Sequence, residues 1–582
     1  MLLTDALVAF RVWVCTILLF VWLPSRVFGQ AAERNVVLRA GARFARMLLL
    51  TIGTVVTFAA LHILNWFTLM LFCVVLLSVG WIHSFKGKIP ANELWNQFLQ
   101  FTGKWENIWK GKRWKHPFRW YREWEWYEFP GRDSDHSSWD YRILPVAVAG
   151  IVAAIIVVHL WWPLQQLRFP GEQGYAVLFR VRELMLDLHP IARPLVMPAL
   201  LATISSLSSV NSMEVTRFVS PLLAILLALT GGIAVASCFR SNWSGLLAAL
   251  ILGAYGIAGP ASVLAKADGG TWARGLGDSL NSALVERYAM SDNQLGAVFL
   301  FLAIAFVAEW YFESRTSLRD AGCCLVLLTI ASPTLLLPAA VMGLAVFVGP
   351  CVAVLTMSLV WTALGMLPIL FPRGVAAQFP SPRLLDVAVT LTIACVFALC
   401  EKLVQRLSNS RMSLAMAAVG VALLLLCMPP QLPQPKFLEY DAAARQMLRI
   451  ERSYPRQHWV AIAPLEQFSQ SFGLGKYEDL GEFVGHFQDD PQRRDCQYGA
   501  DIPVLVFVEK RPFRTFEYEP PSVPFATLVD PTYRNYRSPA GRASLEWTAL
   551  RLCEAYKQSH PDASIFYEDD DLRIYNFRSS KN

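Results

Sequence analysis

The amino-acid sequence predicts a polytopic all-α transmembrane bundle of about twelve spans, followed by a small C-terminal α/β domain. Two observations lead to this fold class. Hydrophobic residues make up 54% of the 582 residues and charged residues only 17%, which is unusual for a soluble protein. Apolar runs that match the roughly 20 helical residues needed to cross a bilayer recur up to Met428 and then stop. Lipid is therefore the expected solvent for most of the chain.

The apolar runs define the candidate spans. A nearly uncharged stretch at residues 321–371 is long enough for three short spans. The other spans are single runs, at residues 8–23, 47–64, 66–81, 143–161, 218–239, 246–257, 295–312, 384–400 and 412–428. The first run is interpreted as a retained span rather than a signal peptide, because no small-residue cleavage site follows it.

Basic residues in the short loops predict the orientation, since cytoplasmic loops are rich in Lys and Arg. Five arginines from Arg26 to Arg46, the lysine cluster in residues 83–142, Arg240 and residues 402–411 all fall on one side of the membrane. That side is expected to be cytoplasmic. The N-terminus, the loops 162–217, 258–294 and 372–383, and the C-terminal domain then face outward. We expect a multi-pass protein of a bacterial-type inner membrane.

Composition divides the chain into four parts. Residues 1–83 hold three spans, and residues 84–142 form a loop in which tryptophans alternate with basic residues. Such a loop suits an anchor in the headgroup layer of an anionic leaflet or a docking site for a cytoplasmic partner. The remaining spans occupy residues 143–430, and the α/β domain occupies 431–582. The net charge of +7 is modest and lies near membrane edges, so nucleic acid is not an expected partner.

The C-terminal domain shows both helical and strand periodicity. Its expected helices are 441–453, 465–472 and 544–558, and its expected strands are 459–462, 502–508 and a hairpin of 564–567 with 572–577 around an acidic turn at 568–571.

Nine of the eleven cysteines lie in apolar runs and suggest no metal site. Cys496 and Cys553 lie in this domain and could form a disulfide in an oxidising compartment.

The outer loop after the fourth span holds the residues most able to carry chemistry. Glu172, Asp187 and His189 lie there close to the membrane, while no Walker loop, H-E-x-x-H, G-x-S-x-G or C-x-x-C motif occurs. Desolvation raises the pKa of a carboxyl beside a bilayer unless it is paired. Such a group is either bonded structurally or used as a base.

The order of motifs in this region is also informative. An apolar span is followed by GEQGYAV, with Glu172 and Tyr175, and then by LHPIARP, with His189. The spans RFVSPLLAILLALTGGIAVA and LLAALILGAYGIAGP follow, joined by the basic turn CFRSNWSG. Over residues 143–313 this arrangement resembles the GT-C glycosyltransferases, polytopic enzymes that include the protein mannosyltransferases.

The resemblance implies a GT-C-like core that transfers a sugar, with inversion, from a polyprenyl-phosphate donor to a protein or glycan acceptor at the outer face. The partners are then the lipid-linked donor, membrane lipids and the acceptor; no cofactor is implied with certainty, and a divalent metal stays an open alternative. Glu172 or Asp187 would be the catalytic base. The implied substrate-binding residues are Tyr175, His189, Asp268, Asp278, Arg274, Arg287 and Arg373, of which the arginines would receive the departing phosphate.

One departure from the family pattern leaves alternatives open. GT-C enzymes normally open this loop with an aspartate, often paired with a second acid, whereas this chain has the single Glu172. Either Glu172 acts with its longer side chain, or Asp187 acts instead, or the activity has been lost and the protein is a non-catalytic assembly protein on the same scaffold. A transporter of a lipid-linked substrate is disfavoured, because the spans hold few charged residues.

Several of these residues also have a purely structural interpretation. Glu172 could be a solvated loop residue, Asp187 a helix cap, and His189 a packing residue before a proline. Arg373 could anchor the chain at the headgroup layer, with its stem in the apolar region.

Overall fold

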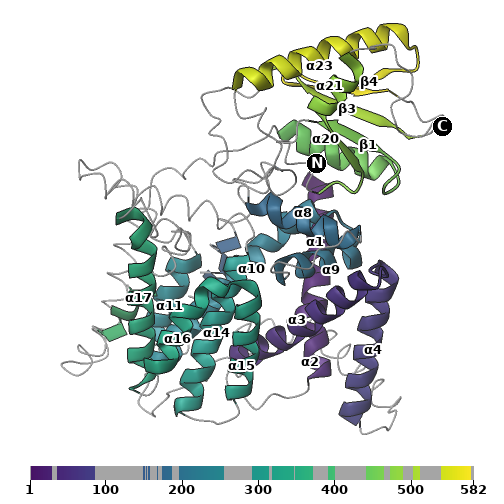
Figure 1. Ribbon diagram of the computed structural model, residues 1–582. Helices are drawn as coiled ribbons and strands as arrows, with labels where there is room; N and C mark the ends of the chain where they lie inside the picture. The colour runs from purple at the N-terminus through teal and green to yellow at the C-terminus, as the bar shows by residue number, and fades with distance from the viewer. Residues whose placement is uncertain are drawn as a thin grey trace, which may run out of the picture.

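A computed structural model of the chain shows two connected parts, a bundle of helices and a smaller domain with a sheet (Figure 1). The structure describes residues 2–28, 36–85, parts of 148–156, 167, 173–186, 196–240, 242–253, 292–312, 317–345, 348–370, parts of 391–399, 441–463, 472–488, 502–511 and 539–577.

The first helices agree with the predicted spans but extend further. Helix α1 (Leu2–Ile17) continues through a π-helical turn (Leu18–Trp22) into α2 (Leu23–Val27), and α4 covers Trp66–Phe85. Helix α3 (Val36–Ala60) begins well before residue 47, where the sequence had predicted the span to start. The early start follows from a buried stripe of Leu38, Ala42 and Ala45, whose spacing places all three on one helical face.

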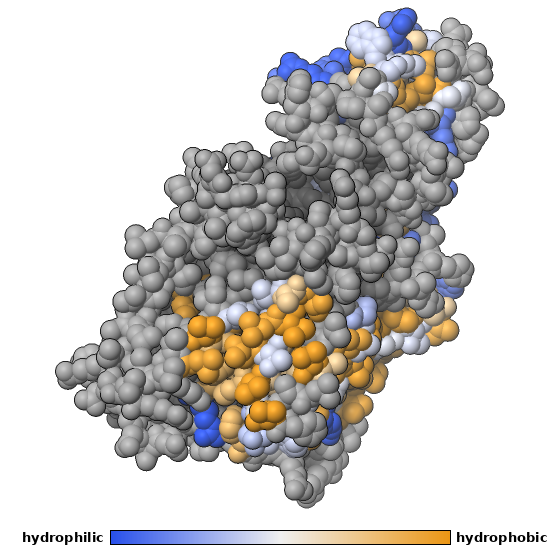
Figure 2. Space-filling model, turned by 60° about the vertical axis from the view of Figure 1, so that its left-hand side comes forward, coloured by the Kyte–Doolittle hydropathy of each residue, from blue (hydrophilic) through white to orange (hydrophobic). Residues whose placement is uncertain are grey.

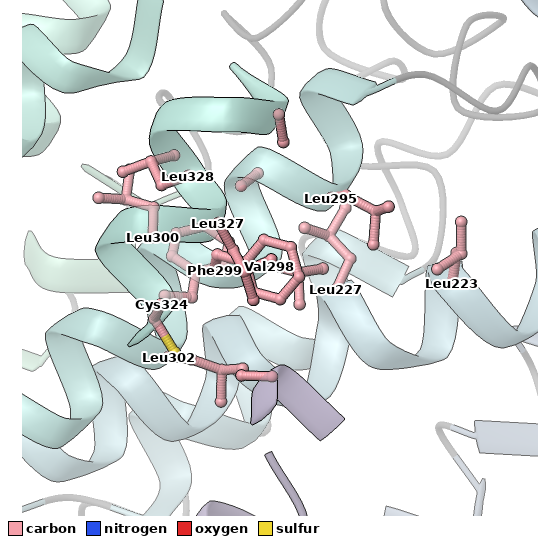
Figure 3. Packing of buried hydrophobic residues seen from close by; sticks show 14 of the residues in the cluster. Leu223, Leu227, Leu295, Val298, Phe299, Leu300, Leu302, Cys324, Leu327 and Leu328 are labelled. Atoms are coloured by element: carbon pink, nitrogen blue, oxygen red, sulfur yellow. The ribbon is translucent and has the colours of Figure 1, made fainter. Parts of the chain in front are cut away.

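The central helices form the core of the bundle. Helix α10 (Ser212–Phe239) packs against α11 (Asn242–Gly253) and α14 (Asp292–Phe312), and α14 packs against α15 (Ser317–Ala331). Leu227 of α10, Phe299 of α14 and Leu327 of α15 meet in one cluster (Figure 3). Helices α16 (Leu336–Ala345) and α17 (Pro350–Leu370) follow α15 in the stretch 321–371, for which the sequence predicted three short spans; whether these helices cross a membrane stays a prediction.

The predicted outer loop 162–217 contains two helices. Helix α8 covers Gln173–Met185, and α9 covers Val196–Ser208. Nearly all of α9 is buried, against α1, α3 and α10 among other helices. At 13 residues α9 is about 20 Å long, too short to cross a bilayer alone. The position of this loop relative to the membrane stays a prediction, while its apolar segment Val196–Ser208 is part of the bundle core.

The length and composition of the apolar helices indicate a membrane protein. Four of the described helices are long and apolar enough to span a bilayer: Asp5–Val27, Leu38–Ala60, Ser212–Phe239 and Gln294–Phe312. Shorter apolar helices cover Trp66–Gly80, Val196–Ser208 and Pro350–Leu364. The outer surface of the helical part carries a broad apolar area, as expected for a lipid-facing surface (Figure 2). The predicted total of about twelve spans includes 143–161, 384–400 and 412–428, which lie partly or wholly outside the described residues.

The C-terminal domain contains a five-stranded mixed sheet in the order β2-β1-β3-β5-β4. Strand β1 (Val460–Ala463) pairs in parallel with β2 (Lys476–Asp479) and with β3 (Val504–Glu509). Strand β5 (Leu572–Asn576) runs antiparallel to β3 and forms a hairpin with β4 (Ser564–Glu568). The predicted hairpin and the predicted strands at 459–462 and 502–508 are therefore confirmed.

Helices cover both faces of this sheet. Helix α20 (Asp441–Ser453) lies on the face toward the bundle, and α21 (Leu480–Gln488) and α23 (Pro539–Ser559) lie on the other (Figure 1). Neighbouring residues of β1 point to opposite faces, as strand geometry requires: Ala461 packs with α20, and Ile462 packs with α21. Helices α20 and α23 agree with the prediction, β2 and α21 were not predicted, and the expected helix at 465–472 falls almost wholly outside the described residues.

Candidate functional site

Helix α8 joins the bundle to the C-terminal domain. Tyr175 and Leu178 of α8 belong to the same buried cluster as α20 and strands β1, β3 and β5. The Arg182 guanidinium donates a hydrogen bond to the Gly475 carbonyl oxygen over 3.0 Å and lies 4.7 Å from the centre of the Tyr477 ring. The domain is thus packed onto the bundle through an apolar core that it shares with α8 and with Met213 of α10.

The buried position of Tyr175 bears on its expected role. Tyr175 is 0% exposed, enclosed by side chains of the C-terminal domain. The resemblance implies that Tyr175 binds substrate; this stays a prediction, and the structure places Tyr175 in the core between the two parts.

A cavity of about 500 Å³ lies beside this core, where α1, α10 and α20 meet. We call it the junction cavity. Leu7, Val8 and Arg11 line it from α1, and Met185 lines it from α8. Helix α9, the turn after it and the first turn of α10 add Ser205, Ser209, Val210, Asn211, Ser212 and Glu214. The C-terminal domain adds Leu448, Glu451, Arg452, Arg456, Phe472 and Leu474.

Asn211 connects the two parts of the molecule at this cavity. Its side-chain oxygen accepts a hydrogen bond of 2.8 Å from the Met213 amide and so caps the N-terminus of α10. Its side-chain nitrogen donates to the Glu451 carboxylate and, over 3.1 Å, to the Phe472 carbonyl oxygen. One amide group therefore orders both the start of α10 and the docking of the domain.

Two carboxyl groups in the junction cavity have different surroundings. Glu214, 6% exposed, forms an ion pair with Arg452. Burial raises the pKa of the Glu451 carboxyl from 4.5 to about 8, and the nearby Glu214 carboxylate adds to the rise. Arg456, Arg452 and the hydrogen bond from Asn211 partly oppose it. A carboxyl group with such a pKa exchanges its proton near neutral pH, a property common in functional sites.

The first span contributes charge to the same region. The Arg11 guanidinium donates a hydrogen bond of 2.7 Å to the Ser208 carbonyl oxygen, at the C-terminal end of α9. Arg217 of α10 also pairs with Asp5 of α1 over 3.4 Å. The hydrogen bond from Arg11 therefore links α1 to the end of α9, next to the turn that carries Asn211. These segments line the bundle side of the cavity.

Most of the residues predicted for the site lie outside the described residues. These are Glu172, Asp187, His189, Asp268, Asp278, Arg274, Arg287, Arg373 and Cys496. Cys553 is buried in α23, and its predicted pairing with Cys496 stays a prediction. Among the described residues no group of three or more His, Cys, Asp and Glu side chains is arranged to hold a metal ion.

The residues that line the junction cavity were not predicted. Two sequence signals could have pointed to them. One is the polar segment NSMEVTR at the start of an otherwise apolar span, and the other is the group of charged residues Glu451, Arg452 and Arg456 at and after the C-terminal end of α20. Neither signal indicates by itself that the two segments meet. No protein-family model matches the chain, and no curated protein matches it either.

Proposed function

We propose that the protein is a membrane glycosyltransferase of the GT-C type, which transfers a sugar from a polyprenyl-phosphate donor at the membrane face that carries the C-terminal domain. The observation that supports this best is the position of the junction cavity. It lies at the first turns of the first span and combines apolar residues of α1 with arginines and carboxyl groups. A lipid-anchored donor and a polar acceptor could both reach such a place.

The proposed reaction is a single displacement. An acceptor hydroxyl oxygen attacks the anomeric carbon, the bond between that carbon and the phosphate oxygen breaks, and its electron pair stays on the phosphate. Glu172 or Asp187 takes the hydroxyl proton, which contributes typically about 10²- to 10⁴-fold to the rate. Arg274, Arg287 or Arg373 stabilises the departing phosphate through charge-assisted hydrogen bonds.

We further propose that this face is the outer face of an inner membrane. The start of α1 and the C-terminal domain lie at the same end of the bundle, since Arg11 of α1 and Glu451 of α20 line one cavity (Figure 1). The excess of basic residues in the predicted cytoplasmic loops supports the assignment of the other face to the cytoplasm.

A transfer assay tests the proposal. Membranes that contain the full chain are incubated with a panel of labelled polyprenyl-phosphate sugars, and label that leaves the lipid fraction is counted. We expect transfer by the wild type and a loss of at least about 100-fold in Glu172→Gln or Asp187→Asn. Glu183→Gln, the same change within α8, is the matched control and should keep its activity. If no donor is consumed above the level of vector-only membranes, the proposal is wrong.

A second candidate function is a non-catalytic assembly protein on the same scaffold. The burial of Tyr175 in the core between α8 and the C-terminal domain favours it, because a residue implied to bind substrate has a packing role there. The same assay separates the two functions. An assembly protein would transfer no sugar, although Tyr175→Ala would still loosen the C-terminal domain and expose it to proteolysis.

A further inference from the structure

The charges that line the junction cavity are predominantly positive. Arg11, Arg452 and Arg456 contribute three guanidinium groups, and Glu214 is an ion-paired carboxylate. If Glu451 is protonated, three positive charges face one negative charge, so the net charge is +2; if Glu451 is ionised, the net charge is +1. The cavity is thus suited to an anion, and the protonation of Glu451 makes it more so.

We propose that the junction cavity binds a phosphate-bearing anion through Arg11 and Arg456, and that Glu451 takes up a proton when the anion binds. The inference does not depend on glycosyl transfer, because an assembly protein with this cavity would bind the same anion.

Arg11 and Arg456 are the guanidinium groups best placed for the ligand. Arg452 already pairs with Glu214, whereas Arg11 donates to a backbone carbonyl oxygen and keeps other N–H donors, since a guanidinium has five. Arg456 is exposed and follows α20 at the rim of the cavity. Arg11 and Arg456 reach the cavity from the bundle and from the domain respectively, and guanidinium groups bind phosphate oxygens in pairs of hydrogen bonds.

The proton uptake follows from the groups that face Glu451. Arg452 and Arg456 lie on its own segment, Glu214 and Asn211 face it from the start of α10, and Arg11 lines the cavity from α1. A bound phosphate would add negative charge to this set and so favour the protonated carboxyl. Linkage then requires the reverse effect as well: the anion binds more tightly as the pH falls through about 8.

Two sources could supply the phosphate, a lipid headgroup or a soluble phosphate. Leu7 and Val8 of α1 line the cavity, and Phe10 and Val14 continue an exposed apolar face down the same helix. This face could accommodate an acyl or prenyl chain. We therefore expect a lipid phosphate to bind more tightly than inorganic phosphate.

Binding measurements on the full chain in nanodiscs test the inference. One arm uses inorganic phosphate with phosphatidylcholine nanodiscs, and the other adds phosphatidic acid to the nanodiscs as a lipid phosphomonoester. Binding in either arm supports the site and identifies its source. We expect Arg11→Gln and Arg456→Gln each to weaken binding about tenfold. Arg449→Gln is the matched control, because Arg449 is an exposed arginine on α20, close to Arg456 in sequence, but lies over the Phe566 ring, 5.0 Å from its centre.

Glu451→Gln tests the proton uptake. This variant should still bind the anion, and its binding should weaken less than that of the wild type as the pH rises from about 6 to about 9. The second ionisation of the phosphate itself, at about pH 6, affects both proteins and cancels in the comparison. Arg11→Lys and Arg456→Lys keep the charge and should bind more tightly than the Gln variants, which separates loss of the site from loss of the fold. Absence of binding in both arms, or equal binding by the Arg456→Gln and Arg449→Gln variants, would overturn the anion site. An unchanged pH dependence in Glu451→Gln would overturn the role of Glu451.

Discussion

Glu214 and Glu451 line the same cavity, but different groups face their carboxyl oxygens. Arg452 pairs with Glu214, whereas Glu451 receives a hydrogen bond from the neutral Asn211 side chain. Burial without a paired cation makes ionisation of Glu451 unfavourable and raises its pKa. Two residues of one type thus have different partners in one cavity, an arginine for Glu214 and an amide for Glu451.

The raised pKa of Glu451 predicts a pH-dependent stability. The unfolded chain releases this proton near pH 4.5 and the folded chain near pH 8, so the stability contribution is complete below about pH 4.5 and is lost as the pH rises to about 8. We expect the free energy of unfolding of the wild type, measured by thermal unfolding, to fall by on the order of a few kcal/mol across this pH range. Glu451→Gln should remove that part of the slope, and the exposed control Glu482→Gln should not.

A buried ion pair on the other side of the bundle gives a second prediction. Arg46 of α3 donates hydrogen bonds of 2.8 and 2.6 Å to Asp320 of α15, whose side chain is 2% exposed. Arg46→Leu should destabilise the protein by about 3–5 kcal/mol, because it leaves a buried carboxylate without its cation. The double variant with Asp320→Leu should regain most of the lost stability, as measured by thermal unfolding. The control Arg319→Leu, which changes an exposed neighbour, should have little effect.

At the scale of the elements, sequence patterns predicted those helices and strands whose periodicity is set by their own residues. The apolar stripe of α20 is of this kind, and the hairpin of β4 and β5 was predicted from the acidic turn between its two apolar segments. Strand β2 has the sequence KYED, which has low strand propensity, and it forms because β1 supplies its hydrogen-bonding partners. The near-complete burial of helix α9 was not predicted for a related reason: it depends on helices distant in sequence.

The site was harder to predict than the fold, for the same physical reason. Its charged groups lie on α1, α10 and α20, and each group looks like an ordinary end-of-helix residue in its own segment. Asn211 and Glu451 are 240 residues apart, so no local pattern can relate them. The sequence pointed instead to Glu172 and Asp187, because acidic residues beside a membrane can be recognised within one segment.

Close packing of α10 and α11 gives a prediction about elements. A Cβ atom on Gly232 would lie 2.7 Å from the Gly245 carbonyl oxygen, and a Cβ atom on Gly245 would lie 2.7 Å from the Gly232 carbonyl oxygen. Gly232→Ala or Gly245→Ala should therefore force the helices apart and destabilise the bundle by about 1–3 kcal/mol. Gly322→Ala in α15 meets no atom within 4 Å and should be neutral or slightly stabilising. Unfolding of the three variants in detergent provides the comparison.

At the scale of the whole molecule, the proposed orientation makes a labelling prediction. Ser453→Cys on the domain and His62→Cys between α3 and α4 should react with a membrane-impermeant maleimide on intact cells. Arg319→Cys at the start of α15 should react only after the cells are permeabilised. Reaction of all three sites on intact cells, or of Arg319→Cys alone, would contradict the orientation.

The capping amide of Asn211 has a consequence for biosynthesis. The ribosome makes the turn that holds Asn211, and the apolar face of α8 beside it, long before it makes α20, which supplies their partners. Until translation ends, the apolar side chains of Leu178 and its neighbours are not covered by the complete C-terminal domain. A chain that ends before residue 441 never forms this contact. Such unfinished chains would carry an apolar surface that quality-control proteases can recognise, so completion of the last domain would decide which copies survive.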